Sequence, residues 1–193
     1  MRYSDTQILA FLNEAQGDAI STTLCIEKQY SFETVSGTTY YSMPDSFITV
    51  KRLISDDQRL DEKSPTKLDK EAAEWETVTG TPINFFINFS SRAKIGFYPV
   101  PDSTSSTTTI SMEYYANADD MTSSSTPFNG ITEFAAFHNM LSYYAAAQML
   151  YIDGLVNMAD RYMQRYIYFK EVFKGSCKAR PSYMPKINMS PNR

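Results

Sequence analysis

The chain has 193 residues and a mass of 22.0 kDa, with 42% hydrophobic and 21% charged residues. This length and composition exclude a disordered protein and allow a core that needs neither a disulfide nor a metal to fold. The net charge of −4 excludes a protein that holds nucleic acid by bulk positive charge. The two distant cysteines, Cys25 and Cys177, indicate reduced thiols in a cytoplasmic protein, and we expect neither a secretory signal nor a membrane span.

The N-terminal residues predict an amphipathic helix. Ser4 and Gln7 have the spacing of a capping box, in which two side chains satisfy backbone amides at the helix start. Apolar residues then recur at helical spacing, at Ile8, Leu12, Ala15 and Ala19. We expect this helix to end between residues 22 and 24, and residues 1–27 to be the N-terminal helix of a bundle.

From residue 28 the apolar period changes to two, which indicates strands. A turn at residues 36–38 predicts that the next strand returns beside the first. The last strand places Ile110, Met112 and Tyr114 on one face. The expected strands are residues 28–34, 40–43, 47–54, 83–89, 93–98 and 108–115. Together they predict a β-rich insert lobe over residues 28–118.

Two features lie between these strands. Residues 68–76 predict a short helix or turn that seats Trp75, the single tryptophan of the chain. Pro99 and Pro101 predict an extended exit from the strand before them, because each proline fixes its own φ and biases its predecessor toward extended backbone.

The last third of the chain predicts two long helices, over residues 133–152 and 155–173. Asp153 and Gly154 separate them, so we expect a helical hairpin and assign residues 119–173 to a linker and this hairpin. Gly175 is expected to end the second helix. The prolines beyond it predict an extended tail over residues 174–193.

This order predicts an α+β fold: a helical bundle of the N-terminal helix and the C-terminal hairpin, an inserted antiparallel β lobe and an extended C-terminal tail. The charge is uneven between these parts. Residues 174–193 hold five cations and no acid, so residues 1–173 carry a net charge of −9 within the total of −4. A basic tail on an acidic body predicts docking on an acidic surface, such as a neighbouring copy.

The sequence offers little for catalysis. His138 is the single histidine, and no nucleophile or orienting acid is marked near it, so a core or interface role is the simpler interpretation. The acidic pairs at residues 56–57 and 119–120 lack the alternating ligands of a calcium loop and predict turns. No phosphate-binding glycine loop or zinc-ligand spacing is present. We therefore expect no enzyme, no catalytic or metal site, and no cofactor.

Several short motifs follow one another in the middle of the chain. A Pro-Asp turn opens a strand, a Trp precedes a Gly-x-Pro, a strand ends in Pro-x-Pro, and a Tyr-Tyr strand precedes an Ala-rich helix. These motifs are Pro44 with Asp45, Trp75 with Gly80 and Pro82, residues 99–101, Tyr114 with Tyr115, and residues 145–147. Their order and spacing resemble the head–tail connector (adaptor) proteins of tailed phages. The resemblance covers residues 40–154 and the helical frame around them.

The resemblance implies a structural virion protein in the neck of a tailed phage, assembled in the host cytoplasm. Such proteins form homo-oligomeric rings, commonly of twelve copies, that join the portal protein to downstream tail or nozzle proteins. Double-stranded DNA passes non-specifically through the centre, and no membrane is involved.

A C-terminal arm in such proteins often reaches onto the portal, and residues 174–193 are this chain's candidate for it. Pre-set proline φ angles lower the cost of ordering an extended arm. The candidate docking residues are Lys174, Lys178, Arg180, Pro181, Tyr183, Pro185, Lys186 and Arg193.

Two alternative functions are also compatible with the sequence. The β lobe is alternatively a receptor- or carbohydrate-binding module of a tail or fibre. Exposed aromatic side chains in a shallow groove would favour that reading, and burial of Tyr40, Tyr98 and Tyr115 would oppose it. An unrecognised enzyme would need a pocket in which Asp, Glu or Arg side chains converge.

Overall fold

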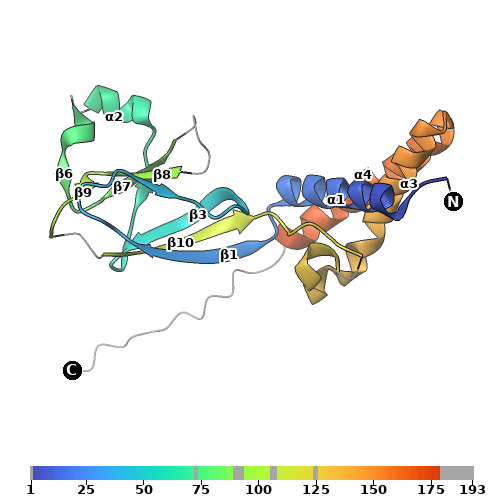
Figure 1. Ribbon diagram of the computed structural model, residues 1–193, viewed down its shortest axis with the longest axis horizontal. Helices are drawn as coiled ribbons and strands as arrows, with labels where there is room; N and C mark the ends of the chain where they lie inside the picture. The colour runs from blue at the N-terminus through green and yellow to red at the C-terminus, as the bar shows by residue number, and fades with distance from the viewer. Residues whose placement is uncertain (1, 72–73, 89–93, 105–107, 124–125, 179–193) are drawn as a thin grey trace. The chain divides into compact units, whose positions relative to one another are not determined.

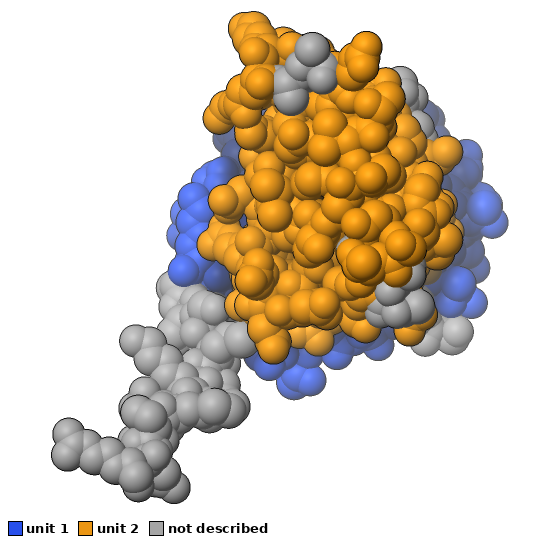
Figure 2. All heavy atoms as spheres, turned by 90° about the vertical axis from the view of Figure 1, so that its left-hand side faces the viewer, with its two compact units in different colours: residues 1–23, 121–193 blue, residues 24–120 orange. Residues whose placement is uncertain are grey.

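The structure is a computed structural model that describes residues 2–71, 74–88, 94–104, 108–123 and 126–178 (Figure 1). It is a mixed α+β fold, as the sequence predicts. The chain divides into two compact units, which Figure 2 shows in different colours. The helical unit consists of residues 1–23 and 121–193, and the β unit consists of residues 24–120.

The helical unit is built from α-helices and short 3-10 helices. Within the described residues these are α1 (Asp5–Thr23), η2 (Pro127–Gly130), η3 (Thr132–Phe137), α3 (His138–Ile152) and α4 (Val156–Lys178). The predicted capping box of α1 is confirmed. The Gln7 amide donates to Ser4 Oγ at 3.3 Å, and the Ser4 amide donates to Gln7 Oε1 at 2.9 Å. Helix α1 ends at Thr23, inside the predicted window.

The helix predicted over residues 133–152 does not begin as an α-helix. Its first turns are the 3-10 helix η3, and the α-helix starts only at His138. Phe128 and Asn129 have positive φ angles just before it, and no side chain caps η3. A tight 3-10 turn is a common way to begin a helix whose first amides lack a side-chain cap.

The helical hairpin is present, but its second helix is longer than predicted. Gly154 has a φ of +75°, and its amide donates to the carbonyl of Tyr151 at 3.0 Å, which closes α3. Helix α4 continues through Gly175 to Lys178, so the prediction that Gly175 ends it is wrong. Residues 174–178 are therefore helical and not extended. A glycine with helical φ costs about 1 kcal/mol but does not stop a helix that is held elsewhere.

Tyr166 joins the N-terminal and C-terminal helices. Its hydroxyl, on α4, lies 3.1 Å from the Ala15 carbonyl and 2.5 Å from Asp18 Oδ2, both on α1. Lys170 Nζ donates to the same carboxylate oxygen at 2.7 Å. Burial, and then the bond to Asp18, raise the pKa of Tyr166 far above its ordinary value. Burial tends to raise the pKa of Asp18, but the bonds from Lys170 and Tyr166 outweigh it and lower that pKa.

An aromatic cluster fills the rest of this core. Phe134 of η3 and Phe173 of α4 meet edge to face with ring centroids 5.0 Å apart, and Phe128 lies 5.3 Å from Phe173. All three side chains are buried. The cluster packs the 3-10 segment that enters α3 against the C-terminal half of α4.

The β unit holds two four-stranded sheets and a two-stranded pair. The first sheet has the order β1-β10-β3-β4, the second has the order β2-β8-β7-β5, and β6 pairs with β9. The strands are β1 (Glu27–Glu33), β2 (Tyr40–Ser42), β3 (Phe47–Ser55), β4 (Gln58–Arg59), β5 (Asp61–Glu62), β6 (Thr79–Gly80), β7 (Asn84–Ile87), β8 (Lys94–Tyr98), β9 (Val100–Pro101) and β10 (Thr109–Ala116). Most pairs are antiparallel, but β5–β7 and β6–β9 are parallel.

The predicted return of the second strand beside the first is wrong. Strand β1 pairs with β10, and β2 pairs with β8 in the other sheet. The connecting residues bond to distant partners. The Thr34 amide donates to Thr108 O at 3.0 Å, and the Gly37 amide donates to Pro101 O at 2.8 Å. These bonds direct the chain from the first sheet to the second. A local hairpin would have kept the second strand in the first sheet.

The core of the β unit follows the predicted alternation. Ile110, Met112 and Tyr114 are buried on β10, as expected for one face of a strand. The helix α2 (Pro65–Glu71) and the 3-10 helix η1 (Trp75–Thr77) seat Trp75 as predicted. Trp75 Nε1 donates to Asp69 Oδ1 at 2.8 Å, and the indole meets Phe86 edge to face at 5.1 Å.

The contact between α1 and α4 gives a first prediction. Replacing Tyr166 by Phe removes a buried hydroxyl and leaves the Ala15 carbonyl and the Asp18 carboxylate without it. We expect a loss of about 1–2 kcal/mol in the free energy of unfolding, measured by urea denaturation. Tyr168→Phe is the matched control, because that side chain is 65% exposed two residues away. Equal effects of the two changes would contradict the role given to Tyr166.

The close approach of β7 and β8 gives a second prediction. A Cβ atom added at Gly96 would lie 2.3 Å from Cζ of Phe86, so the buried ring would have to shift. Gly96→Ala should therefore cost about 1–3 kcal/mol of unfolding free energy in the same assay. Gly17→Ala, with nothing within 4 Å of the new atom in the middle of α1, should be neutral or stabilising. A tolerated Gly96→Ala would contradict the packing described.

Candidate interaction surfaces

No group of three His, Cys, Asp or Glu side chains gathers within metal-binding distance in the part of the chain that the structure describes. His138 lies at the start of α3, half-buried, with its ring 5.9 Å from that of Phe128. Burial lowers its pKa. These surroundings are those of a histidine packed against an aromatic side chain.

None of the described helices combines the length and apolar character that crossing a membrane requires.

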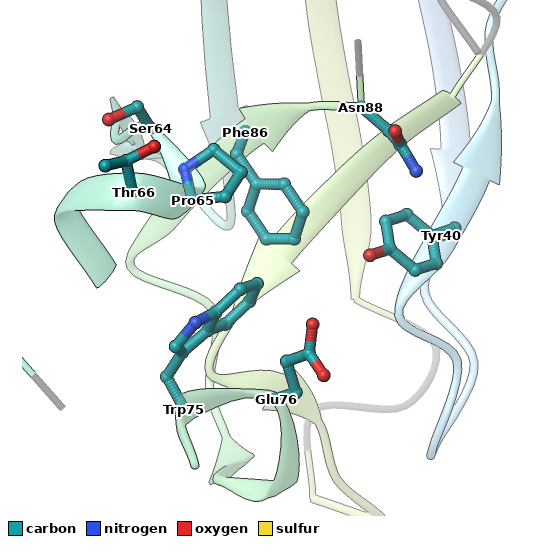
Figure 3. A pocket seen from close by; sticks show the side chains of 8 residues that line it. All are labelled: Tyr40, Ser64, Pro65, Thr66, Trp75, Glu76, Phe86 and Asn88. Atoms are coloured by element: carbon teal, nitrogen blue, oxygen red, sulfur yellow. The ribbon is translucent and has the colours of Figure 1, made fainter. Parts of the chain in front are cut away.

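A pocket of about 350 Å³ opens on the β unit (Figure 3). Its lining residues are Tyr40, Ser64, Pro65, Thr66, Trp75, Glu76, Phe86 and Asn88. Tyr40 is 39% exposed and meets the ring of Phe86 edge to face at 5.9 Å, while Trp75 and Phe86 are almost fully buried. Among the described residues of this lining, Glu76 is the one carboxylate, so they include no pair of acidic side chains. It is an opening onto the aromatic core of the β unit.

A larger groove of about 740 Å³ lies on the helical unit, between the first half of α1 and the segment that enters η2. Its lining is mostly apolar: Asp5, Thr6, Ile8, Leu9, Leu12, Met121, Thr122, Ser123 and Pro127. Asn13 fixes one wall by two hydrogen bonds to the backbone of Met121, at 3.2 and 2.7 Å. We call this surface the α1 groove.

Helix α4 presents a second surface with apolar, aromatic and cationic side chains. They recur every three or four residues and are all exposed: Met158, Arg161, Arg165, Tyr168 and Val172. We call this surface the α4 outer face. Tyr, Met and Arg are the residues enriched at protein–protein interfaces, so its composition is that of a contact surface.

The comparison with known families decides the identity of the chain. The sequence profile of the SU10 adaptor protein family matches residues 1–182, which span both compact units. The chain belongs to the SU10 adaptor protein family. This is a family of phage head–tail adaptors, so the resemblance predicted from the sequence is confirmed. No curated protein matches the chain.

The predicted docking residues of this SU10 adaptor family member fall in two places. Lys174 and Lys178 lie in the last turns of α4, where the carbonyl end of the helix favours cations. The other predicted residues lie outside the described part of the chain: Arg180, Pro181, Tyr183, Pro185, Lys186 and Arg193.

Sequence reasoning missed the α1 groove and the α4 outer face. The residues of the outer face have helical spacing, which the sequence does display, but Tyr162, Tyr166 and Phe169 form a competing stripe on the same helix. The groove has no local signal, because its two walls are more than a hundred residues apart in the chain.

The burial of His138 gives a third prediction. A folded-state pKa below the ordinary value of about 6.5 means that protonation favours the unfolded chain. The wild-type adaptor should therefore lose stability as the pH falls below about 6.5. His138→Leu should remove this part of the loss, seen as a smaller difference between urea midpoints at pH 7.5 and pH 5.5. Identical pH dependence in both proteins would contradict a half-buried neutral imidazole.

Proposed function

We propose that the chain forms a ring in the neck of the phage particle, where it joins the portal to the tail and lets DNA pass through its centre. The observation that carries this proposal is the family match over residues 1–182, since it includes both compact units. The chain is a structural adaptor of a phage. In our proposal a ring of copies performs that role between the portal and the tail.

In this proposal the ring has twelve copies and assembles in the host cytoplasm. Helices α1, α3 and α4 form the helical bundle of each copy, and the β unit is the separate lobe. One side of the ring contacts the portal protein, and the other contacts downstream tail or nozzle proteins. The chain works without a cofactor or catalytic step.

The charge of the chain supports a conduit for DNA. Residues 1–173 carry a net charge of −9, which repels the phosphate backbone and lets a duplex slide without binding. The cations of residues 174–193 are suited to an acidic protein surface away from the channel. We propose that this segment docks on the portal, with the helical turns at Lys174 and Lys178 as its base.

One observation favours the alternative of a receptor- or carbohydrate-binding module. Tyr40 is exposed at the rim of the β-unit pocket, and the pocket volume of about 350 Å³ is within the range of small-molecule sites. Tyr98 and Tyr115, however, are half-buried, and the pocket floor is core. These features therefore favour the adaptor hypothesis over a groove in which aromatic side chains stack on sugars.

The test uses the purified chain and the portal ring of its own phage, imaged together by negative-stain electron microscopy. We expect the full chain to add a layer of density to the portal. A chain ending at Lys178 keeps α4 whole, so weaker binding by it assigns the contact to residues 179–193. A full-length variant with Arg180, Lys186 and Arg193 changed to Gln separates the effect of charge from that of length.

The outcomes separate the proposals. Binding that survives truncation keeps the adaptor and moves the portal contact to residues 1–178. Absence of any layer with the full chain contradicts the ring on the portal. In that case binding of a labelled glycan panel, abolished by Tyr40→Ala, would establish the alternative.

A further inference from the structure

We infer that copies of the chain join head to tail, with the α4 outer face of one copy seated in the α1 groove of the next. The inference rests on the proposed ring and names the surfaces that would build it. Each copy carries both surfaces on its helical unit, so every copy can give one contact and receive another.

The α4 outer face is available to a partner. At 3.6 residues per turn, Arg161 and Tyr168 lie on the side of α4 away from Ala159 and Tyr166, which are buried, and Arg165 lies at the edge of that side. The apolar members, Met158 and Val172, are 49% and 44% exposed. The Arg165 guanidinium lies 5.8 Å from the centroid of the Tyr143 ring of α3, which holds part of the face in position.

The α1 groove has the form that receives a row of side chains. Ile8, Leu9 and Leu12 share one face of α1 and are only half-buried in the single chain. The wall at Met121 is fixed to α1 through Asn13, so the groove is built before a partner arrives. A preformed apolar groove along a helix is a common receptor for the side chains of a second helix.

The charges of the two helices are complementary. Helix α1 carries Asp5, Glu14 and Asp18 and no basic residue. Helix α4 carries five basic residues, Arg161, Arg165, Lys170, Lys174 and Lys178, against two acidic ones, Asp160 and Glu171. Asp18 and Lys170 already pair within one copy, so the other charges are the ones available to a neighbour. Asp5 lines the groove, and two arginines stand on the outer face, so seating one on the other brings opposite charges together.

The same charges disfavour the symmetric alternative, in which two α4 outer faces pair. Such a contact would bring Arg161 and Arg165 of one copy against the same residues of the other, and like charges oppose it. A head-to-tail contact between two different surfaces repeats from copy to copy and closes into a ring when the rotation allows it. The charge pattern therefore selects the contact type that the proposed ring requires.

The test breaks each surface separately and then mixes the variants. Leu9→Glu places a charge in the groove, and Tyr168→Glu places one on the outer face. Ile83→Glu, on the β unit, is the matched control because that side chain is 56% exposed. Each chain is assembled on the portal ring and without it, chemically cross-linked, and analysed by native mass spectrometry for the number of linked copies.

We expect a ladder of linked copies from the wild type and from Ile83→Glu. Either interface variant alone should lose species larger than monomers by about tenfold or more, because burying an unpaired charge at a contact disrupts it. An equal mixture of the two should form dimers with one copy of each variant and nothing larger. In that dimer the intact α1 groove of the Tyr168→Glu copy binds the intact α4 outer face of the Leu9→Glu copy. The remaining surface of each copy is mutated, so no third copy can join.

Three results would overturn the inference. A wild-type ladder from Leu9→Glu or from Tyr168→Glu would show that the surface is not used. Dimers of Leu9→Glu with itself would indicate pairing of two outer faces. Thermal unfolding followed by circular dichroism checks each fold, and the milder Leu9→Ser and Tyr168→Ala replace a variant that fails to fold. Only monomers from the wild type, with and without the portal, would instead overturn the proposed ring itself.

Discussion

The central interaction of the helical unit joins α1 to helices from the other end of the chain. Tyr166 of α4 reaches Ala15 and Asp18 of α1 across about 150 residues of sequence, and Lys170 pairs with the same carboxylate. Helix α1 also packs on α3, and Asn13 binds the backbone of Met121. These long-range contacts make one compact unit from segments that an entire β unit separates.

The β unit is closed in a matching way, since its first and last strands pair. Glu27 of β1 lies opposite Tyr115 of β10, and the Ala116 amide donates to the Ile26 carbonyl at 2.9 Å. The chain therefore leaves the helical unit and returns to it through adjacent strands.

Local patterns predicted most elements, and long-range pairing explains the failures. The capping box at Ser4, the face of Ile110 on β10 and the seat of Trp75 each follow from signals within a few residues. The partner of β2 does not, because bonds from Thr34 and Gly37 to residues far along the chain decide it. The α1 groove could not be predicted for the same reason, because its walls are far apart in the sequence. The adaptor family could be predicted, because several short motifs follow one another in the order typical of that family.

We propose that this SU10 adaptor family member forms a ring whose acidic body surrounds DNA and whose subunits meet through complementary helices. The most direct test of that proposal is an electron cryomicroscopy reconstruction of the portal bound to the full chain, calculated without imposed symmetry. We predict a closed layer of equivalent subunits, coaxial with the portal and open at its centre. Subunits scattered over the outer surface of the portal, or a layer without a central channel, would contradict it.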